Sequence, residues 1–243
     1  MGRAVDAFIE LKVDELAIRK RYDPEMKKVV AANLRRKAEG TFLWVTLACN
    51  ELKKRSVNFI NTRLVLGKLP VGLPGLYARL FDQLLSNRDK EMSEVTFDIL
   101  RAVIIAVRPL HLCELAVVAS LGEEGMKDPE VARRYAELSG SFLVIREEYV
   151  YFVHHSARDH LLELGKEKIF SSDLLKEHET LAIRCLQYIC YDWKYYNESL
   201  DDDPINRSSP NSLDYPLLHW IEHSNIAGSK LQRSYRLNHS FFR

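Results

Sequence analysis

The residues with the most specific chemical spacing lie in the C-terminal part of the sequence. His219, Glu222 and His223 match the pattern H-x-x-E-H, in which two histidines about one helical turn apart bind zinc and the glutamate acts as the base of a metalloprotease. Such a site needs a further protein ligand, usually a downstream carboxylate, and no Asp or Glu follows Glu222. We therefore reject a zinc site and predict a helix that carries these polar side chains on its solvent face.

Other patterns that would support enzyme chemistry are missing from the sequence. A phosphate-binding loop needs an early glycine and a final Gly-Lys-Ser/Thr, so that its backbone amides cradle the phosphates. The segments 67–69 and 228–230 lack both the earlier glycine and the following hydroxyl. Paired acidic residues after an apolar strand, which would hold magnesium, and the hydrolase motif Gly-x-Ser-x-Gly are also absent. The sequence predicts no catalytic residue and no metal site.

Two adjacent histidines, His154 and His155, lie where the hydrophobic pattern changes from strand to helix. Two short runs, 142–145 and 149–153, are rich in β-branched and aromatic residues and flank the polar residues 146–148, which predicts a hairpin. Ser156 and Asp159 then fit a capping box for the next helix. The histidines are therefore expected at the junction between the hairpin and this helix.

Helical patterns surround the hairpin on both sides. Apolar residues at helical spacing predict helices over 6–20, 24–38, 41–54, 76–84, 94–107, 109–121, 128–138, 178–191 and from 215 onward. Prolines and glycines make 69–75 a predicted connector, and the acidic, Ser/Pro-rich segment 197–214 a predicted surface loop. We predict a mainly α fold: a helical domain, a winged helix made of three helices and a β-hairpin with its wing at 146–148, and a second helical domain.

Composition places the chain among ordinary globular proteins. Its 243 residues are 47% hydrophobic, and 35 basic against 34 acidic side chains give a net charge of +1, so charge names no partner. The four cysteines lack metal-ligand spacing and favour reduced thiols. Without a signal-peptide core or a run of about 18 apolar residues, we expect a cytoplasmic protein with no membrane partner.

Several segments resemble successive blocks of one family, the part that follows the nucleotide-binding core in fungal NACHT proteins, which are signal-transducing (STAND) ATPases. The blocks are KAEGTFLWVTLACNEL (37–52), LPVGLPGLYARLFDQL (69–84), ILRAVIIAVRPLHLCELAVV (99–118), YVYFVHHSARDHLL (149–162), HETLAIRCLQYI (178–189) and YPLLHWIEH (215–223). The resemblance implies a helical domain over 1–86, a winged helix over 87–165 and the start of a second helical domain over 166–243.

The resemblance also implies a role for His154. In related ATPases a winged-helix histidine reaches the β-phosphate of bound ADP and holds the closed, inactive state, and the matching residue here is His154. An imidazole N–H at the end of a strand can donate to a phosphate oxygen, whereas His155 is expected to face elsewhere. The alternative is a structural histidine that caps the hairpin.

Gly40 and Phe42 occupy the place where many of these ATPases carry a Gly-x-Pro motif against the adenine. The resemblance implies an adenine contact, but Phe42 replaces the proline. A glycine that separates two helices, with Phe42 in the core, explains the same residues.

The resemblance implies a regulatory segment without its ATPase core, which relays nucleotide state to a sensor in fungal non-self recognition or programmed cell death. We expect no enzyme activity and no cofactor in this chain, with ADP or ATP bound by the intact parent protein. Its partners would be the nucleotide-binding core and C-terminal sensor repeats or other proteins. The alternative is a winged-helix DNA-binding protein, against which the net acidic wing, Arg146-Glu147-Glu148, is evidence.

Overall fold

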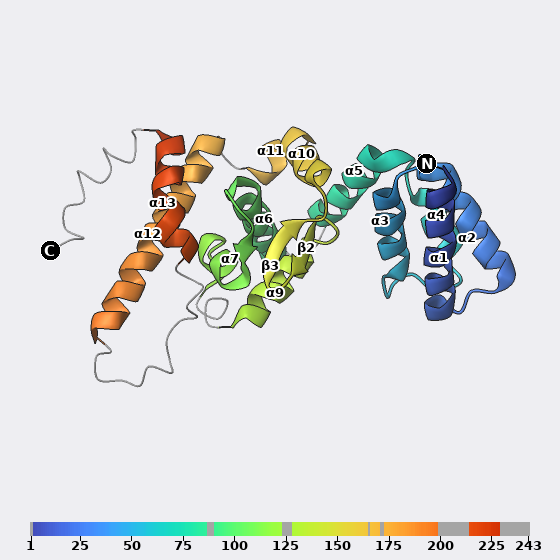
Figure 1. Ribbon diagram of the computed structural model, residues 1–243, viewed down its shortest axis with the longest axis horizontal. Coiled ribbons are helices and arrows are strands. Elements are labelled where there is room, and N and C mark those ends of the chain that lie inside the picture. Colours follow the sequence, from blue (N-terminus) through green and yellow to red (C-terminus); the bar gives the residue numbers. More distant parts are fainter. Residues whose placement is uncertain are drawn as a thin grey trace. The chain divides into compact units, whose positions relative to one another are not determined.

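The computed structural model describes residues 2–86, 90–122, 128–164, 166–170, 173–198 and 214–228. The chain divides into two compact units, Met1–Ser86 and Asn87–Arg243, and each is described by itself (Figure 1). The described part is mainly helical, as predicted, with one small sheet in the second unit.

The first unit is built from five helices within its described residues. They are α1 (Gly2–Lys20), α2 (Pro24–Lys37), α3 (Phe42–Lys53), α4 (Thr62–Lys68) and α5 (Gly72–Leu85). Helix α1 packs against both α2 and α3, and Figure 1 shows α1 to α4 side by side. The largest fully buried side chain is Trp44 of α3, which confirms α3 as the core helix of this unit.

The ends of α2 show how single polar residues fix this bundle. The Asp23 carboxylate accepts a hydrogen bond from the Met26 backbone N–H at 2.6 Å, and Pro24 opens the helix as predicted. Lys37 in the last turn is only 6% exposed and donates to the Leu66 carbonyl at 2.6 Å. The same ammonium group also donates to the Gly67 carbonyl at 3.2 Å, so it binds two carbonyls in the last turn of α4, where carbonyls lack some of their helical partners.

The predicted connector over 69–75 is wrong in its second half, because α5 already begins at Gly72. Gly72 has φ +70, a value that glycine adopts without a Cβ clash. Pro74 falls in the first turn, where a missing backbone N–H breaks no intrahelical bond. Helix α4 was not predicted, since its seven residues are too few for a periodic pattern to appear.

The second unit contains α6 (Lys90–Ile105), β1 (Leu110–His111), α7 (Leu112–Val118), α9 (Pro129–Leu138), β2 (Leu143–Arg146), β3 (Tyr149–Phe152), α10 (His155–Leu164), α11 (Lys166–Ile169), α12 (Leu174–Glu198) and α13 (Asp214–Ala227). The strands form an antiparallel sheet in the order β1-β3-β2. The predicted hairpin is therefore confirmed as β2 and β3, which pair from Leu143 opposite Phe152 to Arg146 opposite Tyr149.

Two boundaries in this unit differ from the sequence prediction. Residues 109–121 are not one helix, because Leu110 and His111 first form β1 against β3, and α7 starts only at Leu112. The helix after the hairpin begins at His155, so the predicted capping box from Ser156 is wrong. Most of the predicted loop, residues 199–213, lies outside the described residues, and α12 continues to Glu198.

No disulfide joins any of the four cysteines, as the sequence predicted. Among the described residues no single helix is long and apolar enough to cross a membrane, although α4 and α5, bent by 113° at their junction, reach that length and composition together.

Candidate functional site

His154 lies in the short link between β3 and α10, where its side chain is exposed. Its Nδ1 accepts the backbone N–H of Ser156 at 3.2 Å and lies 2.8 Å from the Ser156 hydroxyl. The imidazole thus caps the start of α10 in the way that an Asp or Asn side chain usually does. His154 therefore has a structural contact, but it caps the start of α10 and not the hairpin, as the alternative had supposed.

The same contacts fix the tautomer of a neutral His154. Because Nδ1 accepts from a backbone N–H, the ring proton must sit on Nε2. The exposed ring therefore presents an N–H donor, which is the group that a phosphate oxygen would need. Capping and phosphate binding use different nitrogens of one ring, so they are compatible.

His155 does not face away from His154, contrary to our expectation. The two rings lie with their centroids 3.9 Å apart and their planes inclined by 39°. A substitution at His155 would therefore disturb the surface beside His154, and His155 alone is not an adequate control for it.

Gly40 and Phe42 lie in the first unit, between α2 and α3 and at the first residue of α3. Gly40 has φ +73, and no atom lies within 4 Å of a Cβ built there. Phe42 is 47% exposed and meets the Phe8 ring edge to face at 5.3 Å. The alternative that placed Phe42 in the core is wrong, and the glycine is explained by its backbone angle.

The H-x-x-E-H residues of α13 point into different environments. His223 is fully buried, whereas His219 lies 3.3 Å from the Glu222 carboxylate in a partly exposed pair. Our expectation that all three lie on the solvent face was thus wrong for His223. Among the described residues, no group of three His, Cys, Asp or Glu side chains lies close enough together to hold a metal ion.

A buried carboxylate, Glu114 of α7, connects three segments of the second unit. It is 2% exposed and binds Arg108 through two contacts of 2.8 and 2.7 Å. It also accepts the backbone N–H groups of His111, at 2.8 Å, and of Tyr215, at 3.1 Å. Glu114 therefore ties together β1, the segment before it and the start of α13.

The network continues from Glu114 to the hairpin through His111. The His111 Nδ1 accepts the Cys113 backbone N–H at 3.3 Å, so this histidine also caps a helix, α7. Its Nε2 lies 3.1 Å from a carboxylate oxygen of Glu148 in the turn between β2 and β3. A continuous set of polar contacts thus joins this turn to α13.

The other end of this network is a hydrogen-bonded chain across α13. The backbone N–H of Val107 donates to the Tyr215 hydroxyl at 3.1 Å, which lies 2.7 Å from Nε2 of His223. The second ring nitrogen of His223, Nδ1, lies 2.7 Å from Nδ1 of His178 on α12. Burial lowers the pKa of His178 and lowers that of His223 to about 4, because a charged imidazole loses hydration there.

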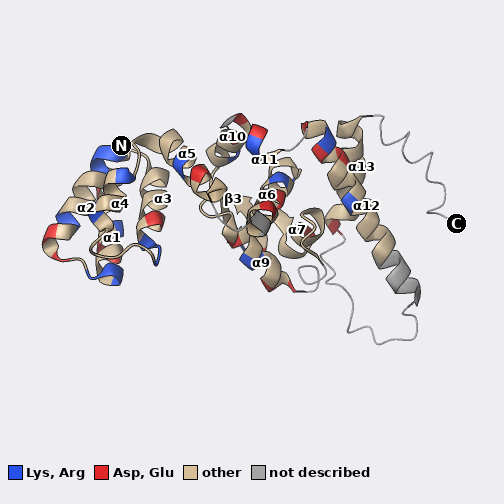
Figure 2. Cartoon of the chain, turned by 180° about the vertical axis from the view of Figure 1, so that it is seen from behind, with Lys and Arg blue, Asp and Glu red and all other residues tan. Residues whose placement is uncertain are grey.

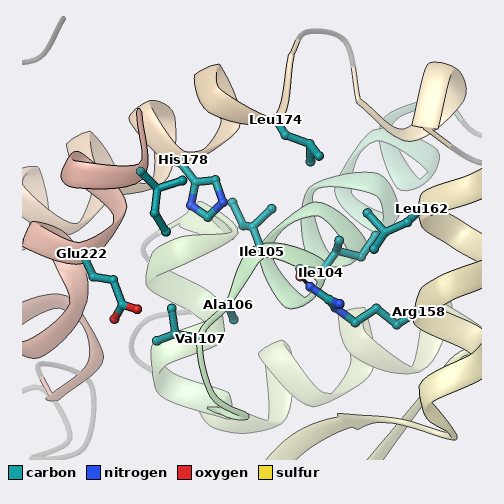
Figure 3. A pocket seen from close by; sticks show the side chains of 10 residues that line it. Ile104, Ile105, Ala106, Val107, Arg158, Leu162, Leu174, His178 and Glu222 are labelled. Atoms are coloured by element: carbon teal, nitrogen blue, oxygen red, sulfur yellow. Dashed lines mark hydrogen bonds between the residues drawn. The ribbon is translucent and has the colours of Figure 1, made fainter. Parts of the chain in front are cut away.

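His178 also lines a cavity of about 460 Å³ in the second unit. The walls are mostly apolar, with Ile104, Ile105 and Val107 from the end of α6 and its following turn. Figure 3 shows Arg158 reaching in from α10 on one side and Glu222 from α13 on the other. The Arg158 guanidinium is already bound to the Ile104 carbonyl through Nε and Nη2.

Sequence reasoning missed Glu114, Arg108 and Tyr215. One local signal was available, because His111 and Glu114 have the spacing of a capping box, here with histidine in place of Ser or Thr. The bond from Tyr215 to Glu114 spans about a hundred residues and has no local signal.

Comparison with known proteins identifies one relative across almost the whole chain. The chain is 32% identical over 244 residues to the vegetative incompatibility protein HET-E-1 of Podospora anserina, and the match covers 92% of this chain. It supports a fungal NACHT-family relationship. The chain spans 18% of the length of that relative. No family model and no solved structure matches the chain.

Proposed function

We propose that this chain is a regulatory segment of a NACHT-type signalling ATPase, in which it relays the state of a bound nucleotide to a sensor region. The relative is named as a vegetative incompatibility protein, which supports heterokaryon incompatibility, a form of fungal non-self recognition, as the general process. In this proposal α6, α7, α9 and the hairpin form a winged helix, and α12 with α13 starts a second helical domain.

The observation that carries the nucleotide part of the proposal is the geometry of His154. Its Nδ1 is engaged by Ser156, which leaves the Nε2–H of an exposed ring available to a β-phosphate oxygen of ADP. The polar contacts from Glu148 through His111 and Glu114 to Tyr215 then offer a physical route from the wing to α13. The proposed partners are the nucleotide-binding core and downstream sensor repeats of the same cytoplasmic parent protein.

Replacing His154 with asparagine in the longer protein should release bound ADP without unfolding α10. The Asn side-chain oxygen can still accept the Ser156 N–H, because asparagine is a good N-cap, but no donor remains where Nε2–H was. Loss of a charge-assisted hydrogen bond of about 1.5–3 kcal/mol shifts a two-state equilibrium roughly ten- to a hundredfold toward the open form. The dissociation rate of a fluorescent ADP analogue measures this effect.

His154→Ala, which removes the cap as well, should release ADP to the same extent and also weaken α10. His155→Ala tests whether the neighbouring ring, 3.9 Å away, contributes, and we expect it to change the ADP dissociation rate less than His154→Asn does. If His154→Asn retains ADP as tightly as the parent, His154 is only a helix cap and the nucleotide role is wrong.

We propose no nucleic-acid partner, because the charges near the hairpin are mixed. On α9 the Arg133 side chain is paired with Glu130 at 2.9 Å, and the turn residues Glu147 and Glu148 are exposed acids. Figure 2 shows acidic and basic segments interspersed along these elements. A groove-binding protein usually presents a basic face to several phosphates.

A gel-shift titration with duplex DNA at moderate salt should therefore show no complex. Balanced charge gives little counterion release, which supplies most of the non-specific affinity for DNA. A salt-sensitive, sequence-selective band would favour the DNA-binding alternative over the relay.

A further inference from the structure

We propose that Tyr215, His223 and His178 form a proton-sensitive latch, which holds α13 in place and releases it when the histidine pair takes up a proton. This histidine latch uses none of the residues assigned above to nucleotide binding. Tyr215 and His223 belong to α13, and His178 belongs to α12. Helix α13 packs on α12 and α7, so the latch would govern this docking.

The direction of the hydrogen-bonded chain follows from its first donor. A backbone N–H can only donate, so the Tyr215 hydroxyl accepts from Val107. Because Tyr215 is 0% exposed, its own hydrogen needs an acceptor inside the protein, and Nε2 of His223, 2.7 Å away, supplies one. His223 must then carry its proton on Nδ1 and donate to Nδ1 of His178. His178 consequently carries its proton on Nε2. Each bond in the chain is satisfied only when both rings are neutral.

An added proton breaks this chain wherever it binds. On His178 it would occupy Nδ1 and oppose the Nδ1–H of His223 across 2.7 Å. On His223 it would occupy Nε2 and remove the acceptor of the Tyr215 hydroxyl, 2.7 Å away. Tyr215 and His223 are both 0% exposed, so a donor that loses its partner there cannot turn to water.

The groups around the latch do not stabilise the positive charge that such a proton would add. His219 on α13 adds a further imidazole that disfavours charge on His223. Glu222 favours charge on His178, but its side chain is 53% exposed and already faces His219. The remaining neighbours are Cys185 of α12, Arg158 of α10 across the cavity, and the mutually paired Arg108 and Glu114.

The sign of the pH effect follows from the neutral rings. Burial lowers the pKa of His223 to about 4, whereas a released histidine titrates near about 6.5. The docked helix therefore binds fewer protons than the released one, and docking is strongest above about pH 6.5 and weakens as pH falls toward about 4.

Hydrogen exchange of the whole chain tests the latch. Between about pH 7.5 and about pH 5, the protection of α13 amides, corrected for intrinsic rates, should fall by roughly thirtyfold, the factor given by these two pKa values. Amides of α2, which lies in the other unit and contains no histidine, are the internal reference. Equal changes in α13 and α2 would overturn the proposal.

His223→Gln removes the titrating group while leaving an oxygen to accept from Tyr215. In this variant the α13 amides should be less protected from exchange at about pH 7.5. Their further loss of protection between about pH 7.5 and about pH 5 should be less than about threefold. The matched control is His155→Asn, an exposed histidine on α10, which should keep the full response. A full acid response in His223→Gln would show that other groups release α13.

The tautomers give a test that needs no variant. In imidazole nitrogen-15 spectra of the unsubstituted chain at neutral pH, His223 should be protonated on Nδ1 and His178 on Nε2. The reverse pattern, or a charged ring at either position, contradicts the latch.

Discussion

Replacing Glu114 with alanine should lower the free energy of unfolding of the second unit by about 2–5 kcal/mol, chiefly because two buried backbone N–H groups lose their acceptor at about 1–3 kcal/mol each. The carboxylate accepts four hydrogen bonds in all, from the Arg108 guanidinium and from two backbone N–H groups, those of His111 and Tyr215. Alanine leaves both backbone donors buried without an acceptor, whereas the Arg108 guanidinium is 32% exposed and keeps its bond to the Pro109 carbonyl. Urea unfolding followed by exchange of α7 and α13 amides measures the loss.

Glu130→Ala is the matched control for this prediction. Glu130 also pairs with an arginine, Arg133, but its side chain is 58% exposed, and exposed pairs contribute about 0–1 kcal/mol. If the two substitutions cost the same, Glu114 does not organise the second unit, and the path of polar contacts from the β2–β3 turn to α13 loses its central residue.

Trp44→Ala should cost the first unit about 3–5 kcal/mol, the range for truncating a large aromatic side chain in a core. Trp44 is 0% exposed, and α3, which carries it, packs against α1, α4 and α5. The midpoint of urea unfolding, followed by circular dichroism, should fall accordingly. Phe42→Ala, two residues earlier and 47% exposed, should cost less than about 1.5 kcal/mol.

A large loss at Phe42 would mean that its contact with Phe8 anchors α1 to α3. A small loss of stability in Trp44→Ala would mean that the helices of the first unit move together and fill the space left by the indole. A well-packed core rarely does this.

The sequence predicted the elements whose signals are local and long. The hairpin at 142–153 was predicted correctly because two β-rich runs flank a polar turn, and α2 because Asp23-Pro24 is a strong helix start. Strand β1 was missed because its two residues, Leu110 and His111, continue a helical pattern. Only their pairing with Val150 and Tyr149 makes them a strand.

Among the site residues, too, those with a local sequence signal were predicted, and those whose role depends on distant packing were not. His154 could be named in advance because it lies in a distinctive strand-to-helix segment. The buried role of His223 could not, because H-x-x-E-H describes spacing along one helix and not what packs on it. His178 comes 45 residues before its partner His223, and only the packing of α12 on α13 brings the two together.

The turn between β2 and β3 shows which of its two positions can be changed in protein engineering. Glu147 and Glu148 both have positive φ, 50 and 67, in a turn where Asn-Gly is usually favoured, and each such residue costs about 1–2 kcal/mol. Glu148 contacts His111, so its carboxylate has a structural role in this turn. Glu147 has no such contact among the described residues. A library built for thermostability should therefore vary Glu147 toward asparagine or glycine and leave Glu148 fixed.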